Sequence, residues 1–135
     1  MIKFELKSDF KGVGKNNMGV TKTGIHYPKP AFVAWRQSII KQLPKSYPRI
    51  TTADYLWHFS YTPADKRRRD ITAILDGLFH CFERANIVKD DSLIKNVIFL
   101  TNKRSKTKAG MVIRIFDTPN WRVACDKLED NLCPF

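Results

Sequence analysis

The sequence predicts an α/β fold, on the border with α+β, in which a mixed β-sheet packs against two main helices. Two periodicities support this prediction. Short stretches place apolar residues at every second position, as half-buried strands do, and longer stretches place them every three or four positions, as amphipathic helices do. These stretches alternate along 135 residues, a length and an order that suit one layered domain with a substantial core.

The chain begins with a strand and a surface hairpin. Ile2, Phe4 and Leu6 alternate with charged residues, which is typical of a half-buried strand. The segment from Phe10 to Gly24 is rich in glycine and asparagine, and these residues adopt the positive φ angles that turns require. This segment therefore predicts a hairpin on the surface.

A helix and an aromatic strand follow the hairpin. Pro30 opens the helix, which runs to about Leu43 and is ended by Pro44. The strand runs from Tyr55 to Thr62 and carries an aromatic side chain at every second position. Such a row either forms sheet core beneath a helix or stacks nucleic-acid bases, and we expect the core. The core face of the helix is Phe32, Trp35, Ile39 and Leu43, and the aromatic row is Tyr55, Trp57, Phe59 and Tyr61.

The longest amphipathic stretch runs from Asp70 to Ala85. Its apolar residues form one stripe along a helix, and Asp76 and His80 lie one turn apart on the opposite, polar face. A helix of this length spans roughly 24 Å. Asp91 therefore approaches Asp70 only if the chain folds back after the helix, or if a neighbouring strand brings a second acidic group alongside. The apolar stripe is Ile71, Ile74, Leu75, Leu78, Phe82 and Ala85, and the polar face is Thr72, Asp76, His80 and Glu83.

The second half of the chain predicts two more strands joined by a basic loop. The stretch from Leu93 to Leu100 is apolar on both faces, which favours an internal strand. The stretch from Met111 to Phe116 predicts another strand, and we expect it to form a hairpin with the previous one across the loop from Asn102 to Lys108. Residues 1–117 then form one domain, and the tail 118–135 is expected to be a short helix packed on it.

The formal net charge of +11 at pH 7 attracts polyanions at long range. We expect nucleic acid rather than a membrane, because no basic amphipathic helix suited to a membrane surface and no apolar run long enough to span one is evident. Three cysteines without paired zinc spacing, and no signal-peptide core, predict a cytoplasmic protein. Lys15 and the other lysines of the first hairpin leave two interpretations open, a flexible surface hairpin and a basic arm that closes over DNA.

Cations and carboxylates are concentrated between Lys66 and Ser92. Lys66 and three arginines lead directly to Asp70, and the pair Asp90-Asp91 follows the amphipathic helix. Phosphodiester hydrolysis needs cations that hold the phosphate backbone and acids that hold a divalent metal. Each group also has a structural explanation on its own, namely a solvated basic loop, a helix N-cap at Asp70 and a turn at Asp90.

The run Arg67-Arg68-Arg69 ending on Asp70, the helix after it and the later pair Asp90-Asp91 resemble the RusA family of Holliday junction resolvases, found in phages and prophages. The resemblance extends more loosely from Ile2 to about Phe116. It implies a RusA-like fold and a small homodimer that binds branched DNA, namely four-way junctions, and cuts paired strands with Mg²⁺. The joint occurrence of these groups at the family's spacing favours the catalytic interpretation over the structural ones.

The chain departs from the family's motif along the helix. Where the family has a second Asp, an Asn and often a Lys, this chain has Thr72, Ala73 and Asp76. Asp76 is the candidate replacement for the carboxylate missing at Thr72, because the two positions lie four residues apart on one helix face. Asp70, Asp76 and Asp91 are thus the candidate catalytic residues, and together with Asp90 they are the candidate ligands of Mg²⁺, or of Mn²⁺ as a substitute.

The sequence therefore predicts a magnesium-dependent, structure-selective DNA endonuclease. Two other functions stay open. One is a DNA-binding protein that has lost its nuclease activity, an alternative that Thr72 and Ala73 support. The other is a nuclease that acts on structured RNA. His80 is either an exposed helix residue or a group that adjusts the metal site. The candidate DNA-binding residues are Lys15, Lys66, Arg67, Arg68, Arg69, Lys103, Arg104, Lys106 and Lys108.

Overall fold

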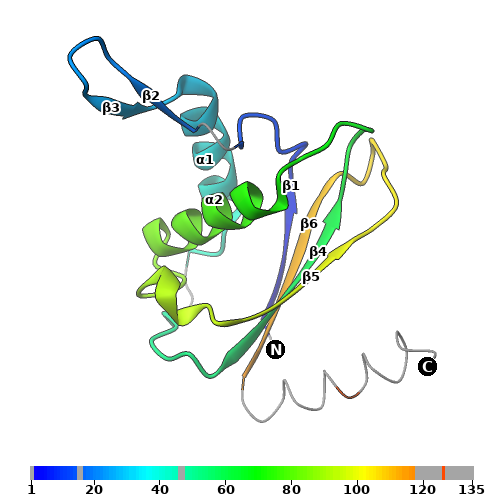
Figure 1. Ribbon diagram of the computed structural model, residues 1–135. Helices are drawn as coiled ribbons and strands as arrows, with labels where there is room; N and C mark the ends of the chain where they lie inside the picture. The colour runs from blue at the N-terminus through cyan, green and yellow to red at the C-terminus, as the bar shows by residue number, and fades with distance from the viewer. Residues whose placement is uncertain (1, 15–16, 46–47, 118–125, 127–135) are drawn as a thin grey trace.

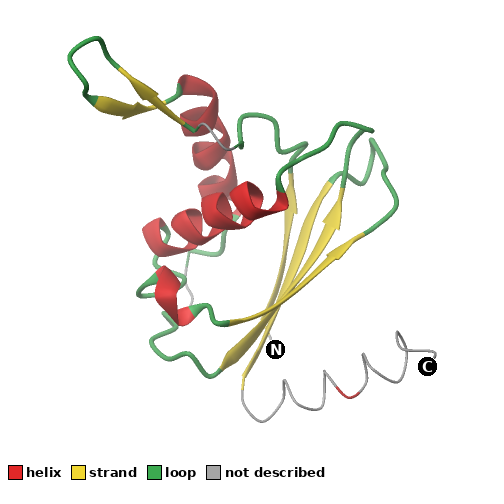
Figure 2. Cartoon of the chain, viewed as in Figure 1, coloured by secondary structure: helices red, strands yellow, loops and turns green. Residues whose placement is uncertain are grey.

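The computed structural model describes residues 2–14, 17–45, 48–117 and 126, and its elements form two layers. A four-stranded mixed sheet is one layer, and the helices α1 and α2 cover one face of it (Figure 1). Figure 2 shows the same view coloured by secondary structure. A mixed sheet with two helices is the fold predicted from the sequence, and that prediction is confirmed. The elements are β1 (Ile2–Lys7), β2 (Met18–Val20), β3 (His26–Pro28), α1 (Pro30–Gln42), β4 (Tyr55–Thr62), α2 (Ile71–Arg84), the 3₁₀ turn η1 (Asp91–Leu93), β5 (Asn96–Thr101) and β6 (Gly110–Asp117).

The central strand β4 decides the strand order, which is β1-β6-β4-β5. β4 pairs in parallel with β5, where Phe59 lies opposite Phe99, and it pairs antiparallel with β6, where Phe59 lies opposite Ile113. In the described sheet β5 is therefore an edge strand. The strand predicted at 93–100 is present, but its predicted internal position is wrong, and so is the predicted hairpin with 111–116. The reason is the crossover through α2, which returns the chain to one side of β4 and leaves the other side for β6.

Aromatic side chains fill the space between the sheet and α2. Trp57, Phe59 and Tyr61 are buried on the face of β4 that meets the helices. The rings of Trp57 and Phe59 both stack on Phe82 of α2, with centroid distances of 5.4 and 6.3 Å. The aromatic row is therefore sheet core, as expected, and it does not offer a platform for bases.

Local chemistry sets both ends of α2. At the start, the side chain of Asp70 accepts a hydrogen bond from the backbone N–H of Ala73, as an N-cap does. At the end, Asn86 adopts a left-handed φ of 58°, and the N–H of Ile87 donates to the carbonyl of Phe82 at 2.9 Å. This Schellman motif turns the chain sharply away from the helix axis. Val88 then forms a bridge with Ile50, beside the loop that follows α1.

The helix α1 crosses α2 at a glycine. The structure confirms the expected helix and its core face, since Phe32, Trp35 and Ile39 are all buried. A Cβ atom at Gly77 of α2 would lie 2.9 Å from Cζ3 of Trp35, which is closer than side chains normally approach. The bare Gly77 backbone therefore provides the room into which the indole of α1 packs.

Three sequence predictions concern the surface and the ends of the chain. The predicted hairpin exists but extends further than Gly24, because its second strand is His26–Pro28. No helix in the described part of the chain is long and apolar enough to cross a membrane. The predicted helix of the 118–135 tail lies outside the described residues.

We expect Gly77→Ala to destabilise the protein by about 1 kcal/mol net, which urea unfolding can measure. Alanine is intrinsically better in a helix by about 1 kcal/mol, but overpacking against Trp35 costs typically 1–3 kcal/mol. Gly14→Ala is the matched control, because a Cβ there meets no atom within 4 Å. If the Gly77→Ala protein is as stable as the parent, the Trp35 side chain can move aside at no cost. Close packing at this crossing then does not fix the positions of the two helices.

Candidate functional site

Three loop segments meet at one end of the sheet. In the strand register Lys7 of β1 and Thr62 of β4 both pair with Gly110 of β6, and Tyr61 pairs with Thr101 of β5. The segments 8–11, 63–69 and 102–109 therefore leave the sheet at the same end, which is the upper end in Figure 1. The 63–69 segment leads directly into α2, so Asp70 also lies at this end.

Cations dominate this end of the sheet, which we call the basic end. Hydrogen bonds hold two of its segments together: the N–H of Ser105 donates to the carbonyl of Pro63 at 2.8 Å, and the N–H of Asn102 donates to that of Tyr61 at 2.7 Å. The two basic runs singled out in the sequence are thus neighbours in space. The cations of the basic end are Lys7, Lys11, Lys66, Arg67, Arg68, Arg69, Lys103, Arg104, Lys106 and Lys108.

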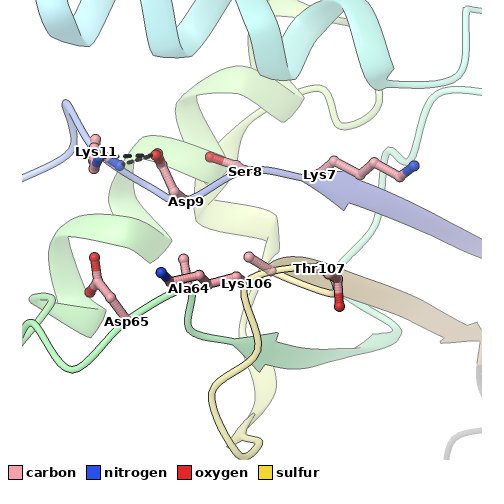
Figure 3. A pocket seen from close by; sticks show the side chains of 9 residues that line it. Lys7, Ser8, Asp9, Lys11, Ala64, Asp65, Lys106 and Thr107 are labelled. Carbon is pink, nitrogen blue, oxygen red and sulfur yellow. Dashed lines mark hydrogen bonds and ion pairs between the residues drawn. The ribbon is translucent and has the colours of Figure 1, made fainter.

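A groove of about 490 Å³ lies between the three segments. Figure 3 shows that its lining combines lysines with two carboxylates, and that Lys11 pairs with Asp9, whose Oδ2 lies 3.7 Å from Nζ. Lys106 was a candidate DNA-binding residue. Lys7 and Asp9 were missed because they stand apart from any charge run, and Asp65 was missed although it directly precedes one. The groove is lined by Lys7, Ser8, Asp9, Lys11, Ala64, Asp65, Lys106, Thr107 and Ala109.

Arg69 points inward, unlike the other cations of its run. Its Nη2 lies 3.5 Å from Oδ2 of Asp65, its Nε donates to the carbonyl of Asp9 at 3.4 Å, and its side chain is only 13% exposed. Arg69 therefore ties the 8–11 segment to the 63–69 segment, and contact with a phosphate would compete with these bonds. Arg67 and Arg68 are exposed and available to a ligand. The spacing of Asp65 and Arg69, four residues apart, was the available signal for this pairing.

The candidate catalytic residues near the basic end lie on the first turns of α2. Asp70 is half-buried and serves as the N-cap, so the structural explanation of this residue holds. Thr72 and Asp76 are exposed on the outer face of the helix, as the periodicity predicted. Ala73 is 7% exposed and belongs to the core, so an asparagine at this position would bury a polar amide instead of joining Asp76 on the surface.

Asp90 and Asp91 lie at the opposite end of α2. The η1 turn packs beside this helix, and the charge of Asp91 acts on His80. His80 lies ten positions after Asp70, which is about 15 Å along the helix axis. The chain does turn after the helix, as the catalytic interpretation required, but the turn does not bring Asp91 back to Asp70. In the described part of the chain, no three His, Cys, Asp or Glu side chains are grouped so that they could hold a metal ion.

Hydrogen bonds explain the position of Asp90. Its Oδ1 accepts from the backbone N–H of Ser92 at 2.8 Å and so caps η1. The side-chain and backbone hydrogen bonds from Ser92 are the main reason that the pKa of Asp90 lies below its usual range. The turn that was the structural alternative for this position is therefore present, and it keeps a negative charge on the capping carboxylate.

His80 is held between α1 and the C-terminal half of α2. Its Nε2 lies 3.4 Å from Nη1 of Arg36, which itself stacks over the ring of Phe32. Partial burial and then the charges of Arg36 and Arg84 lower the pKa of His80, while Glu83 and Asp91 oppose this shift. A neutral imidazole accepts a hydrogen bond from Arg36, so the residue is half-buried and partnered, rather than the exposed histidine that the sequence favoured.

No model of a known protein family matches the chain, and a search of curated proteins finds no significantly similar sequence. The candidate DNA-binding residue Lys15 lies outside the described residues.

We expect the free energy of unfolding to fall as the pH is lowered from about 7 to about 5, the range in which unperturbed histidines gain a proton. His58 is only 7% exposed, and burial followed by the charge of Arg114 lowers its pKa. The pKa of His80 is lowered as well. Below the histidine pKa of the unfolded chain, the unfolded state therefore binds more protons than the folded state. Protonation then favours unfolding.

Two variants separate the contributions of these histidines. In thermal melts over this pH range, His58→Leu should flatten the pH dependence most, because His58 is the more buried ring, and His80→Gln should flatten it less while keeping an acceptor for Arg36. An undiminished pH dependence in both variants would contradict this assignment.

Proposed function

We propose that the protein is a magnesium-dependent endonuclease that binds branched DNA and resolves four-way junctions by paired cuts. The observation that carries the proposal is the convergence of two basic runs, Lys66–Arg69 and Lys103–Lys108, at the end of the sheet where Asp70 begins α2. A cationic surface beside a carboxylate is the combination that phosphodiester hydrolysis uses. The sequence resemblance to RusA resolvases supports the same activity.

The charge of the basic end supports DNA as the substrate. Its exposed lysines and arginines lie on loops that border an open groove, where their flexible side chains can follow a phosphate backbone. Like charges gathered so closely repel one another, and a polyanion relieves this repulsion when it binds. Asp9 and Asp65 neutralise part of the charge of the groove lining, which also carries Lys7, Lys11 and Lys106 and so keeps a positive balance.

The carboxylates fit magnesium by their chemistry. Asp76 is exposed on α2, Asp90 and Asp91 are exposed beside η1, and hard carboxylate oxygens are the ligands that Mg²⁺ and Mn²⁺ prefer. Asp70 and Asp76 would offer carboxylate oxygens on the first turns of α2, near the basic end, and Asp90 and Asp91 would offer theirs at the opposite end of this helix, so the two pairs of the proposal do not surround one ion within the described chain. Once bound, the ion would supply a nucleophilic water and neutralise charge at the phosphate. Arg67 and Arg68 would hold the flanking phosphates in position.

A homodimer is part of this proposal, because a four-way junction offers two-fold symmetry to a two-fold protein. We place its action in the cytoplasm of a bacterial or phage-infected cell. The second candidate is a DNA-binding protein without nuclease activity, and the observation that favours it is the placement of Asp70 and Asp91 at opposite ends of α2. Incubation of a synthetic four-way junction with Mg²⁺, compared with a gel shift in EDTA, distinguishes the two.

We expect junction binding to weaken steeply with salt, because phosphate contacts release counterions. Arg68→Ala and Lys106→Ala should each reduce the slope of log Kd against log salt by about one, whereas Lys41→Ala on α1 should leave it unchanged. Fluorescence anisotropy at several salt concentrations measures the slope. If the slope is the same in the Arg68→Ala and Lys106→Ala proteins as in the parent, the basic end does not contact DNA.

Asp70→Asn should abolish cutting and leave junction binding intact or tighter, because the change removes an anionic ligand and also a charge that repels phosphate. Asp91→Asn should do the same. If Asp76 replaces the carboxylate missing at Thr72, Asp76→Asn should cost on the order of a hundredfold or more in rate. Single-turnover cleavage of a labelled junction measures each effect.

The control for this series is Glu83→Gln, which removes a carboxylate from the same helix outside the proposed set. It should cut at the parent rate. Full activity in the Asp70→Asn or Asp91→Asn protein would refute the catalytic assignment, and the same assay on a structured RNA would expose an RNA nuclease.

A further inference from the structure

The β2–β3 hairpin carries apolar side chains that the rest of the described chain does not cover. It extends beyond α1, away from the sheet (Figure 1). Among the described residues, four of the six large apolar side chains that are strongly exposed belong to it: Met18 at 49%, Val20 at 57%, Ile25 at 64% and Tyr27 at 43%. An isolated two-stranded hairpin is marginally stable in water, so a hairpin with apolar residues on its surface suits contact with a partner.

The base of the hairpin is firmly attached to the body. Phe10 and Val13 are buried in the core just before it. Asn17 closes its base, since its carbonyl accepts from the N–H of Lys29 at 2.9 Å and its side chain accepts from the N–H of Gly14 at 2.8 Å. The hairpin is therefore presented in a defined direction, only a few residues along the chain from the groove at the basic end.

Tyr27 has a defined place on one face of the hairpin. It pairs with Gly19 of β2, and a Cβ atom at Gly19 would lie 2.4 Å from Cζ of the Tyr27 ring. The ring therefore lies across the bare backbone of Gly19, where any other residue would displace it. Ile25 stands on the same face towards the tip, beside a backbone hydrogen bond that its carbonyl accepts from Thr21.

The charge around the hairpin identifies the kind of partner. From Phe10 to Pro30, the stretch that contains the hairpin, the sequence has four lysines and no aspartate or glutamate. Lys22 and Lys29 belong to the hairpin itself and are exposed. A partner must therefore supply negative charge together with flat apolar surfaces. Nucleic acid offers both, as phosphates and as base faces, whereas a second copy of this chain would bring a net charge of +11.

We propose that the β2–β3 hairpin is a probe that contacts unstacked bases at a DNA branch point, with Tyr27 stacking on a base and Ile25 wedged beside it. Lys22 and Lys29 would lie against the flanking phosphates. Bases at a branch point are easier to unstack than those within a continuous duplex, so such a probe would select branched over linear DNA. This inference rests on the proposed DNA-binding function and adds the element that distinguishes a junction.

The test compares a four-way junction that carries 2-aminopurine at its centre with a linear duplex of the same sequence, in EDTA. Tyr27→Ser should weaken junction binding about five- to a hundredfold, the range for losing one stacked base, and should abolish the fluorescence rise of 2-aminopurine. Duplex binding should change less than twofold. Tyr27→Trp should restore both signals, and Val97→Ser, which removes an exposed apolar residue of β5, should behave as the parent.

Ile25→Ser keeps the Tyr27–Gly19 contact and should also weaken junction binding selectively, so the test does not depend on one variant. If the Tyr27 and Ile25 variants bind like the parent while Arg68→Ala binds weakly, the hairpin proposal is wrong and the DNA-binding proposal stands. If Arg68→Ala also binds like the parent, both are wrong. Sedimentation of each variant supplies a separate outcome: a loss of dimer in Tyr27→Ser would identify the hairpin as a contact between two copies and overturn the proposal.

Discussion

The stacking of Phe82 on Trp57 and Phe59 is the contact on which the rest of the structure depends. All three side chains are fully buried, and they lie where the middle of the central strand β4 meets the last turns of α2. Because this contact sets the line of α2 across the sheet, it decides where both ends of the helix lie. The N-terminal end, with Asp70, meets the loops of the basic end, and the C-terminal end meets η1.

The basic end shows how a fold accommodates many like charges in a small space. Repulsion among its cations is lowered where Asp9 and Asp65 face the groove and where Arg69 ties two segments together. Arg67 and Arg68, next to it in the sequence, remain exposed. One arginine of the run thus serves the structure, and the others stay available to a polyanion. In the proposed function, this division lets a loop carry charge without losing its shape.

The hairpin and the basic end make complementary contributions to the proposed binding of DNA. Phosphate contacts supply affinity that does not depend on shape, because every duplex offers the same backbone charge. Selectivity for a branch needs contacts that a continuous duplex does not offer, and the exposed faces of Tyr27 and Ile25 can make them. The two surfaces lie only a few residues apart along the chain, and a hydrogen bond from Gly14 to Asn17 holds the base of the hairpin, so a branched substrate could reach both.

The sequence by itself determined the elements and much of their burial. The period of Trp57 and Phe59 predicted a strand with a buried face, and Asp70 before an amphipathic stretch predicted the start of α2, because such patterns depend on local geometry. Only the tertiary structure decided that β5 is an edge strand, that Arg69 binds the carbonyl of Asp9 and that Asp91 lies at the other end of α2 from Asp70. These outcomes depend on which segments meet across the sheet, and pairings between distant segments leave no period in the sequence to read.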